Sequence, residues 1–526
     1  MTATTKLTIL STSDTHGYVL PTNYVIRAGV QPFGLTRAAT VINTVRQEDP
    51  EHTLVVENGD FLQGSPLAYY AVRGTAQPDP TLLTQAYNAL GYDVGTLGNH
   101  EFNYGSAYLR QVLATLTYPL AQANILAADG QPAFAPPYQL IKKGELTVAV
   151  LGLTTSFIPH WEGPDHIAGL QFADVLATAK TWVPRLRKLA DVVVVIYHGG
   201  FERDLASGAP TERLTGENVG YALSAIPGID ALVTGHQHRQ LAGHVHGVPI
   251  TQPGYRGEAV GQITLTVAHS GNQWQVQASS ARLLPTGEAA PDPQMTTLMA
   301  PVQATVEDWL DSPLGRVQGD MRITDPDAAR ITESPYIEFI QKVQMAATGT
   351  DISGTALFNN EGTGFGSTVS LRDVMTNYIY PNTLAVLRVT GSVLKAALEK
   401  SARYFQPGPH GTIAVNPRFL TPKPQRYNYD MYHGITYTID VAQPMGERIT
   451  QLDYHGAPVR PDQVLEITVN QYRAGGGGNY TMFSADSIVR ENQKDMTELI
   501  ADYLKAHPVI TATADHNFHV INSSAT

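Results

Sequence analysis

The chain has no cysteine, and charged residues make up only 16% of its 526 residues. Without cysteine neither a disulfide framework nor a thiolate metal site can form, so any metal must be held by His, Asp, Glu or Asn. No run of about 18 apolar residues is present, so we expect no membrane span. The 47 acidic residues exceed the 35 basic ones. We therefore expect no binding to polymeric nucleic acid, which needs a basic face.

The start of the chain lacks a basic stretch followed by an apolar run of about 7–15 residues, so the sequence shows no signal peptide. Residues 1–6 lead directly into the strand-like run Leu7–Leu10. We expect a cytoplasmic location for the chain as numbered, or an extracytoplasmic one if a leader has been removed. The pattern says nothing about the oligomeric state.

Residues 1–285 alternate short apolar runs with helical patterns, which is typical of a layered α/β domain. The expected strands are Leu7–Leu10, Thr53–Glu57, Leu146–Leu151, Val192–Tyr197, Ala231–Val233 and Ile263–Val267. The expected helices are Leu35–Arg46, Leu82–Leu90 and Leu176–Leu189.

A Pro- and Ala-rich segment then breaks this alternation and leads into an expected helix, Met295–Leu310. We interpret residues 286–314 as a linker and residues 315–526 as a second α/β domain. In that domain the expected helices are Ser370–Tyr378 and Ser392–Tyr404, and the expected strands are Leu384–Val389, Ile435–Val441 and Val464–Val469.

Five short blocks of metal-binding side chains lie in the first domain, at the ends of expected strands. They are Asp14-Thr-His16, Asn58-Gly-Asp60, Gly98-Asn-His-Glu101, His198 and Gly235-His-Gln-His238. In an open α/β sheet, ligands bind beyond the carboxyl ends of the strands. Carboxylate, amide and imidazole ligands suit a pair of divalent first-row metals better than Mg²⁺ alone.

Each block has an ordinary explanation when it is taken alone: a helix cap, a solvated loop or a buried polar pair. The spacing of His236 and His238 recurs in His244-Val-His246, which we interpret as part of a strand facing solvent. Five such blocks in order, each beside a strand end, instead indicate a single metal site.

The order of these blocks resembles the calcineurin-like metallophosphoesterases. The strings Phe33–Arg37, Asn58–Ser65 and Leu97–Asn103 resemble the bacterial nucleotidase group of that family. The strings Tyr380–Leu384, Val389–Gly391 and Tyr429–Gly434 are similar to the 5′-nucleotidase C-terminal domain. The resemblance implies a four-layer β-sandwich flanked by helices, joined by a linker helix to a second α/β domain.

The resemblance also implies a role for individual residues. One metal would be bound by Asp14, His16 and His238, the other by Asn99, His198 and His236, and both by Asp60. The two ions would be divalent Mn, Zn, Fe or Co, and a metal-activated hydroxide would attack phosphorus. His100 would act on the transferred group, and Asn103 would orient His100.

Three positions distinguish branches of the family. The 5′-nucleotidase/UDP-sugar hydrolase branch typically has Asp at the positions that are Asn103 and Gly478 in this chain. That branch also has an Arg in the string that corresponds to Asn359–Gly366, and this chain has none there. The strings Gly98–Gly105 and Tyr380–Leu384 look more like the 2′,3′-cyclic-nucleotide 2′-phosphodiesterase/3′-nucleotidase branch. We therefore expect hydrolysis of small nucleotide phosphate esters, with a 5′-nucleotidase as the alternative.

Tyrosines of the second domain are candidates for binding the base. Tyr472 could form a sandwich with Tyr427 or with Tyr429, since aromatic stacking stabilises a bound base by about 1–3 kcal/mol. The ordinary alternative is that they are half-buried aromatics at strand edges. The run Gly475–Gly478 lacks the following Lys of a phosphate-binding loop. We interpret it as a turn that passes close to the base.

Two other functions remain open. A non-catalytic binding or surface-interaction protein on this scaffold would be expected to have lost metal ligands, but all seven positions are filled. A metallohydrolase of another ester, such as a UDP-sugar or a sulfur-bearing conjugate, would keep the ligands and differ in its specificity residues.

Overall fold

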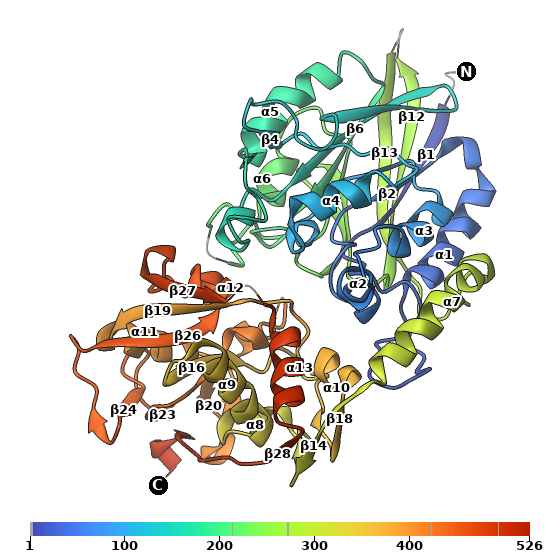
Figure 1. Ribbon diagram of the computed structural model, residues 1–526. Coiled ribbons are helices and arrows are strands. Elements are labelled where there is room, and N and C mark those ends of the chain that lie inside the picture. The colour runs from blue at the N-terminus through green and yellow to red at the C-terminus, as the bar shows by residue number, and fades with distance from the viewer. Residues whose placement is uncertain (1–3, 213, 271–272, 422, 493, 526) are drawn as a thin grey trace. The chain divides into compact units, whose positions relative to one another are not determined.

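The computed structural model describes residues 4–212, 214–270, 273–421, 423–492 and 494–525. The chain divides into two compact units, Met1–Glu307 and Asp308–Thr526 (Figure 1). Helix α7 (Pro293–Leu310) contains the point of division. Within the described ranges, no helix is both long and apolar enough to cross a membrane.

The first unit contains two mixed β-sheets, which Figure 1 shows with helices around them. The five-stranded sheet has the order β13 (Gln273–Pro285), β12 (Ala259–Ser270), β1 (Thr4–Thr12), β2 (Thr53–Glu57) and β3 (Val94–Gly95). The six-stranded sheet has the order β10 (Gln240–Val245), β11 (Val248–Pro253), β9 (Ala231–Thr234), β8 (Val192–His198), β6 (Leu146–Thr154) and β5 (Tyr138–Lys143). The central strands β1–β2–β3 and β6–β8–β9–β11 run parallel.

Strand β8 shows why the parallel strands are so apolar. All seven of its residues are buried. Val192, Val194 and Ile196 belong to a core cluster that also includes side chains of the five-stranded sheet. The alternate residues Val193 and Val195 pack in a second cluster with side chains of helix α5 (Val175–Leu186). Because both faces are covered, the strand is hydrophobic at successive positions and does not alternate with polar residues.

The helices and strands expected in the first unit are confirmed to within a few residues. The expected helices correspond to α1 (Leu35–Glu48), α3 (Thr81–Leu90) and α5. Three shorter helices are added, α2 (Pro66–Tyr69), α4 (Gly105–Leu113) and α6 (Gly220–Ser224). The outer strands β5 and β13 were not expected, because they are only half-buried and lack a continuous apolar run.

The second unit is built around a five-stranded sheet. Its order is β22 (Asp430–His433), β16 (Ile352–Ala356), β26 (Val464–Asn470), β19 (Leu384–Thr390) and β27 (Ile488–Asn492). Its main helices are α9 (Pro335–Thr348), α10 (Leu371–Asn377), α11 (Gly391–Ala402) and α13 (Met496–Ala506). Smaller sheets include one with the order β25 (Ala457–Pro458), β24 (Ile449–Tyr454), β23 (Thr436–Asp440) and β29 (Phe518–Ile521).

The helices and strands expected in the second unit are also confirmed. The tyrosine-rich stretch at residues 427–432 is only partly a turn. Only Arg426–Asn428 forms a turn of 3-10 helix, and Asp430–His433 forms strand β22, which pairs with β16. Part of the stretch therefore belongs to the core of the unit.

Candidate metal centre and substrate residues

The seven predicted metal ligands all lie at the carboxyl ends of parallel strands of the first unit. The loop after β1 carries Asp14 and His16, the loop after β2 carries Asp60, and the loop after β3 carries Asn99. His198 is the last residue of β8, and His236 and His238 follow β9. The parallel strand order therefore brings blocks that are far apart in the chain to one place.

Five of these seven residues have left-handed backbone, which side chains other than glycine rarely adopt. Their φ angles are 54° for Asp14, 50° for His16, 59° for Asp60, 68° for His236 and 56° for His238. Such a conformation costs free energy and persists only where the surroundings impose it. Here the loops after β1 and β2 hydrogen-bond each other, from Asp14 N to Gly59 O and from His16 N to Asp60 O. The strain is concentrated where the ligands converge.

Asp14, His16 and His238 form the first cluster. One ligand atom of each lies within 4.8 Å of the others. His16 Nε2 is 3.0 Å from His238 Nε2, and His238 Nε2 is 3.5 Å from Asp14 Oδ1. These are the three residues that the resemblance assigns to one metal.

Asp60, His198 and His236 form the second cluster, again with ligand atoms within 4.8 Å. His198 Nε2 lies 3.1 Å from Asp60 Oδ2, and His236 Nδ1 lies 2.9 Å from Asn99 Oδ1. Asp60 Oδ2 is also 4.0 Å from His16 Nε2 of the first cluster. The Asp60 carboxylate thus stands beside both clusters, as a bridging ligand would.

Backbone carbonyls fix the orientation of two of the imidazole rings. His16 Nδ1 donates to Gln63 O at 2.8 Å, and His198 Nδ1 donates to Asn58 O at 2.7 Å. Each ring therefore keeps its Nε2 lone pair for the centre, which is the usual arrangement of a metal-ligating histidine. Asp60 Oδ2 and His198 Nε2 are both buried and face each other at 3.1 Å, and neither has a hydrogen bond to another group. Since buried polar atoms normally have partners, these residues fit a bound divalent cation.

The electrostatics of the centre also fit a cation. Burial raises the pKa of the Asp14 carboxyl. Burial acts in the same direction on Asp60, but the neighbouring His198 and His100 hold its pKa well below the usual value. Burial alone would lower the pKa of His198, yet Asp60 and Asp14 raise it to about 10. The two buried acids thus favour a positive charge beside them, which a divalent cation would supply.

Glu101 is a buried acid in this centre, and its role was not predicted from the sequence. Its carboxylate accepts hydrogen bonds from Asp60 N at 2.8 Å, Phe61 N at 2.8 Å and Gly98 N at 2.6 Å. It thereby holds the loops after β2 and β3 against each other. Glu101 directly follows His100 in the Gly-Asn-His-Glu string, and this position could have indicated that it belongs to the centre.

Three more residues that contact the metal ligands were not predicted from the sequence. His236 Nε2 lies 3.0 Å from Glu217 Oε1, and the Trp161 ring stacks on the His236 ring with centroids 5.2 Å apart. The Tyr255 ring stacks on the His238 ring at 4.8 Å, with only 2° between the planes. These residues come from loops without a recognisable motif, so no local pattern could have indicated them.

His100 is held by three contacts. Its backbone N donates to Asp60 Oδ1 at 2.7 Å, and its ring lies 5.2 Å from the His16 ring. Its Nδ1 is 2.7 Å from Asn103 Oδ1, the orienting contact expected from the sequence. The amide of Asn103 in turn donates to Glu162 Oε2 at 2.7 Å, a contact that was not expected.

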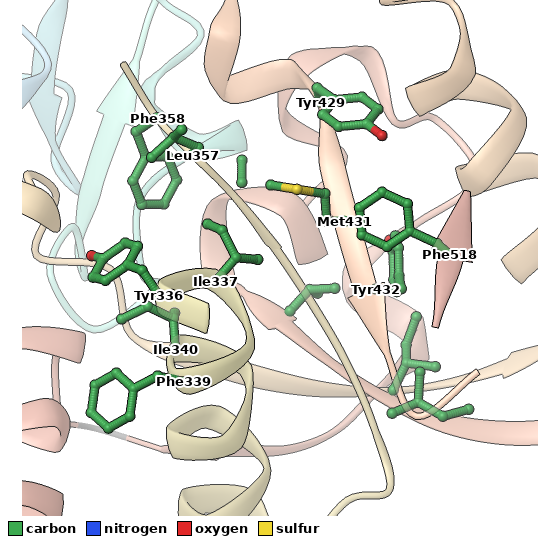
Figure 2. Close-up of a cluster of buried hydrophobic side chains, with 14 of the residues drawn as sticks. Tyr336, Ile337, Phe339, Ile340, Leu357, Phe358, Tyr429, Met431, Tyr432 and Phe518 are labelled. Carbon is green, nitrogen blue, oxygen red and sulfur yellow. The ribbon is translucent and has the colours of Figure 1, made fainter. Parts of the chain in front are cut away.

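The structure corrects one of the candidate tyrosines. Tyr429 has no exposed surface, and its ring packs against Tyr404 and Phe405 with centroids 5.3 and 4.9 Å apart. Figure 2 shows Tyr429 above Met431 within the hydrophobic core of the second unit. It is buried because it leads into strand β22, so neither of its faces is open to a base.

Tyr427 and Tyr472 are both half-buried in the second unit, and Arg473 connects them. The Arg473 guanidinium donates to Tyr427 O at 2.7 Å and lies 5.7 Å from the centre of the Tyr472 ring. Arg473 is itself buried and paired with Asp430. Of the two candidate sandwiches, the structure is compatible with Tyr427 and Tyr472.

The glycine run packs against this same group. A Cβ on Gly477 would lie 2.6 Å from the Tyr472 ring, and one on Gly478 would lie 1.9 Å from Asn428 Oδ1. Gly478 also has a φ of 68°, which favours glycine. The run therefore permits close approach of the backbone to the tyrosine and asparagine side chains, and its contact with a base stays a prediction.

Comparisons with known proteins agree with this architecture. Residues 7–240 match the family model for calcineurin-like phosphoesterases, and residues 313–485 match the model for the 5′-nucleotidase C-terminal domain. The fold and the centre thus define a two-domain hydrolase of the metallophosphoesterase type with a site suited to two metals.

The chain is also similar to individual named proteins. The chain is 30% identical to a 2′,3′-cyclic-nucleotide 2′-phosphodiesterase/3′-nucleotidase of Salmonella typhimurium, with 98% of this chain and 89% of the relative covered. A protein of the same name from Yersinia enterocolitica is 29% identical, with 98% and 88% covered. The chain belongs to the 5′-nucleotidase family.

A solved structure also matches over the full length. It is a Staphylococcus aureus protein described as a candidate 5′-nucleotidase, in complex with alpha-ketoglutarate. It is 39% identical to this chain, with a TM-score of 0.90 and with 98% of this chain and 100% of that one covered. The match supports both the two-unit architecture and the family.

Proposed function

We propose that this protein hydrolyses phosphate esters of nucleotides, with 2′,3′-cyclic nucleotides and 3′-nucleotides as its preferred substrates. The observation that carries the proposal is the pair of ligand clusters that meet at Asp60, with His100 beside them. Relatives named for these two activities match the chain over nearly its whole length.

The proposed ligands of the first ion are Asp14, His16 and His238, and those of the second are Asn99, His198 and His236. Asp60 serves both. Imidazole ligands favour first-row divalent ions such as Mn²⁺, Zn²⁺, Fe²⁺ or Co²⁺ over Mg²⁺. When bound, such a pair neutralises phosphoryl charge and lowers the pKa of a water molecule towards neutrality.

His100 is the proposed acid–base residue. Its Nδ1 proton is committed to the carbonyl of Asn103, so Nε2 remains to exchange a proton with the leaving oxygen. Its backbone N–H is bound to Asp60, which ties the position of the ring to the bridging ligand. The residue can thus be placed by the metal centre without serving as a ligand.

Selectivity for nucleotides must come from elsewhere, because the centre recognises phosphorus, which every phosphate ester offers. We assign it to Tyr472 and Tyr427 of the second unit. Both are partly exposed, and the Arg473 guanidinium lies near both, bound to the backbone carbonyl of Tyr427 and 5.7 Å from the centre of the Tyr472 ring.

The direct test compares four substrates with protein loaded with Mn²⁺: 2′,3′-cyclic AMP, 3′-AMP, 5′-AMP and a UDP-sugar. We expect the first two to have the highest kcat/KM, and Asp60→Asn to abolish turnover of all four. A dominant rate with 5′-AMP would contradict the preference and favour the 5′-nucleotidase alternative, to which the description of the Staphylococcus aureus structure points. If wild type and Asp60→Asn had the same low rate, the proposal that this metal centre catalyses hydrolysis would be wrong.

A further inference from the structure

A second group of potential ligands lies in the second unit, apart from the centre described above. Glu333, Glu338, His433 and Asp515 each place a ligand atom within 4.8 Å of the others. Glu333 lies two residues before helix α9, His433 ends strand β22, and Asp515 lies in the loop between β28 (Val509–Thr511) and β29. The group joins three segments that are far apart in the sequence.

Two buried atoms of this group have no hydrogen-bond partner. The side chain of Glu333 is only 1% exposed, and its Oε1 is unpartnered. The Nδ1 atom of His433 is likewise buried and unpartnered. Leaving such atoms unsatisfied costs about 1–3 kcal/mol each, more for a charged group. Glu333 also has a strained backbone, with a φ of 62°.

The distances between these atoms match ligands of one ion better than hydrogen bonds. His433 Nδ1 is 4.0 Å from Glu333 Oε1 and 3.8 Å from Asp515 Oδ2. Both distances are too long for a hydrogen bond, which ends near ~3.5 Å. In a tetrahedral zinc site, ligand atoms about 2.0–2.2 Å from the ion lie about 3.3–3.6 Å from one another, so a side-chain shift of a few tenths of an ångström would bring these atoms to ligand spacing.

The group also lacks positive charge. Among the described residues of the group and their ion pairs, the one ammonium is Lys342 Nζ, and it is bound to Glu338. Burial and the nearby Asp515 raise the pKa of the Glu333 carboxyl to about 7. Among these residues, two carboxyl groups thus lie close together beside the His433 imidazole, with no permanently charged side chain between them.

Backbone contacts fix this arrangement. Glu333 Oε2 accepts from His516 N at 2.8 Å, and Glu338 Oε2 accepts from Asp515 N at 2.8 Å. The loop that carries Asp515 is therefore attached to the start of helix α9. Because Oε2 of Glu333 is occupied, Oε1 is the oxygen that remains for the group.

We propose that Glu333 Oε1, His433 Nδ1 and Asp515 Oδ2 bind one zinc-type divalent cation. One imidazole and two carboxylates form a ligand set that zinc accepts, whereas Ca²⁺ and Mg²⁺ prefer oxygen alone. The side chain of Asp515 is 54% exposed, so water can complete the coordination. The ion would link β22, the start of α9 and the loop before β29.

The test uses the full-length chain after metal removal, dialysed against buffered ZnCl₂ and analysed for zinc per chain by mass spectrometry. We expect three ions in wild type. Glu333→Gln and His433→Asn should each bind one fewer, with affinity for that ion reduced about a hundredfold or more, since even loss of an outer-shell partner costs 10–100-fold. Both variants should keep the hydrolytic activity of the wild type.

His455→Asn is the matched control. His455 Nε2 also lies 4.0 Å from a carboxylate oxygen of a neighbouring residue, Asp351, but there both side chains are well exposed. This variant should bind three ions. Asp60→Asn should lose ions of the first unit and keep this one, which separates the two sites. Two ions in wild type, or a third ion that persists in Glu333→Gln and His433→Asn, would overturn the proposal. If Glu333→Gln does not fold, His433→Asn decides alone.

Discussion

Asn103 Oδ1 lies 2.7 Å from His100 Nδ1, and this contact fixes more than the position of the ring. The amide nitrogen of Asn103 donates to Glu162, and a carboxylate can only accept, so the amide has one possible orientation. Its carbonyl then needs a proton from His100 Nδ1. The tautomer of His100 is therefore set by Glu162, through an uncharged asparagine.

Replacing His100 should separate catalysis from metal binding. We expect His100→Ala to lower kcat about 10²–10⁴-fold, the usual range for a positioned acid–base group, while both ions of the first unit stay bound. Elemental analysis and steady-state kinetics on the same preparation measure the two effects. Loss of metal in step with activity would show that His100 is a ligand.

Glu162→Gln should lower kcat with little change in KM. A glutamine amide can face Asn103 with either its oxygen or its nitrogen, so the orientation of Asn103 is no longer determined. Asn103→Asp alone should also be harmful, because it sets two carboxylates against each other.

The double variant Asn103→Asp/Glu162→Gln should recover activity relative to either single variant. In it, the amide introduced at position 162 can donate to the carboxylate introduced at position 103, and that carboxylate can accept from His100. A double-mutant cycle in kcat measures the coupling. Additive losses would mean that Glu162 does not act through residue 103.

Asp60→Asn should weaken both metal sites of the first unit at once. The carboxylate lies beside ligands of both clusters, and the substitution removes its charge while asparagine tolerates the φ of 59°. Zinc or manganese content after dialysis is the readout. Two tightly held ions in the first unit of this variant would contradict a bridging role.

Removing the Tyr472 ring should affect nucleotides selectively. Loss of one stacking face costs about 1–3 kcal/mol, so Tyr472→Ala should raise KM for 3′-AMP by about 5- to 150-fold. Hydrolysis of bis-p-nitrophenyl phosphate should hardly change. Tyr454→Ala, at another half-buried tyrosine of the second unit, is the control. An equal loss of activity towards both substrates would indicate that Tyr472 has a structural role.

Stability should depend on pH through Lys400, which is half-buried beside the Tyr480 ring. Burial, together with Arg403 and Arg473, lowers its pKa to about 8. Between this value and the ordinary one near 10.5, the unfolded chain binds more protons than the folded one, so the free energy of unfolding rises with pH.

Lys400→Met should remove this rise, which amounts to at most about 3 kcal/mol. Urea unfolding at pH 7.5 and pH 10 measures it as a change in the difference between wild type and variant. Lys395→Met, at an exposed position of the same helix α11, should behave as wild type. An unchanged difference at the two pH values would contradict the lowered pKa.

The sequence predicted the features that are local in the chain. Asp14 and Asp60 lie two and three residues after strands β1 and β2, and the parallel order of those strands brings their ends together. The centre could therefore be expected from strand ends alone. Glu162 and Glu217 could not be expected, because they reach the centre from irregular loops. The burial of Tyr429 could not be expected for a related reason: it leads into the four-residue strand Asp430–His433, which is too short to be recognised until its partner strand β16 is known.

The left-handed backbone of the metal loops limits which substitutions can be interpreted there. At Asp14 and His238, alanine would remove a ligand and strain the chain in one step, so its effect would be the sum of two losses. Asparagine or glycine tolerates that backbone and isolates the loss of the ligand. Asn99 has a φ of −81°, and His198 lies in a regular strand, so alanine is a clean probe at both. Mutational profiles of this centre should therefore divide by backbone geometry as well as by chemistry.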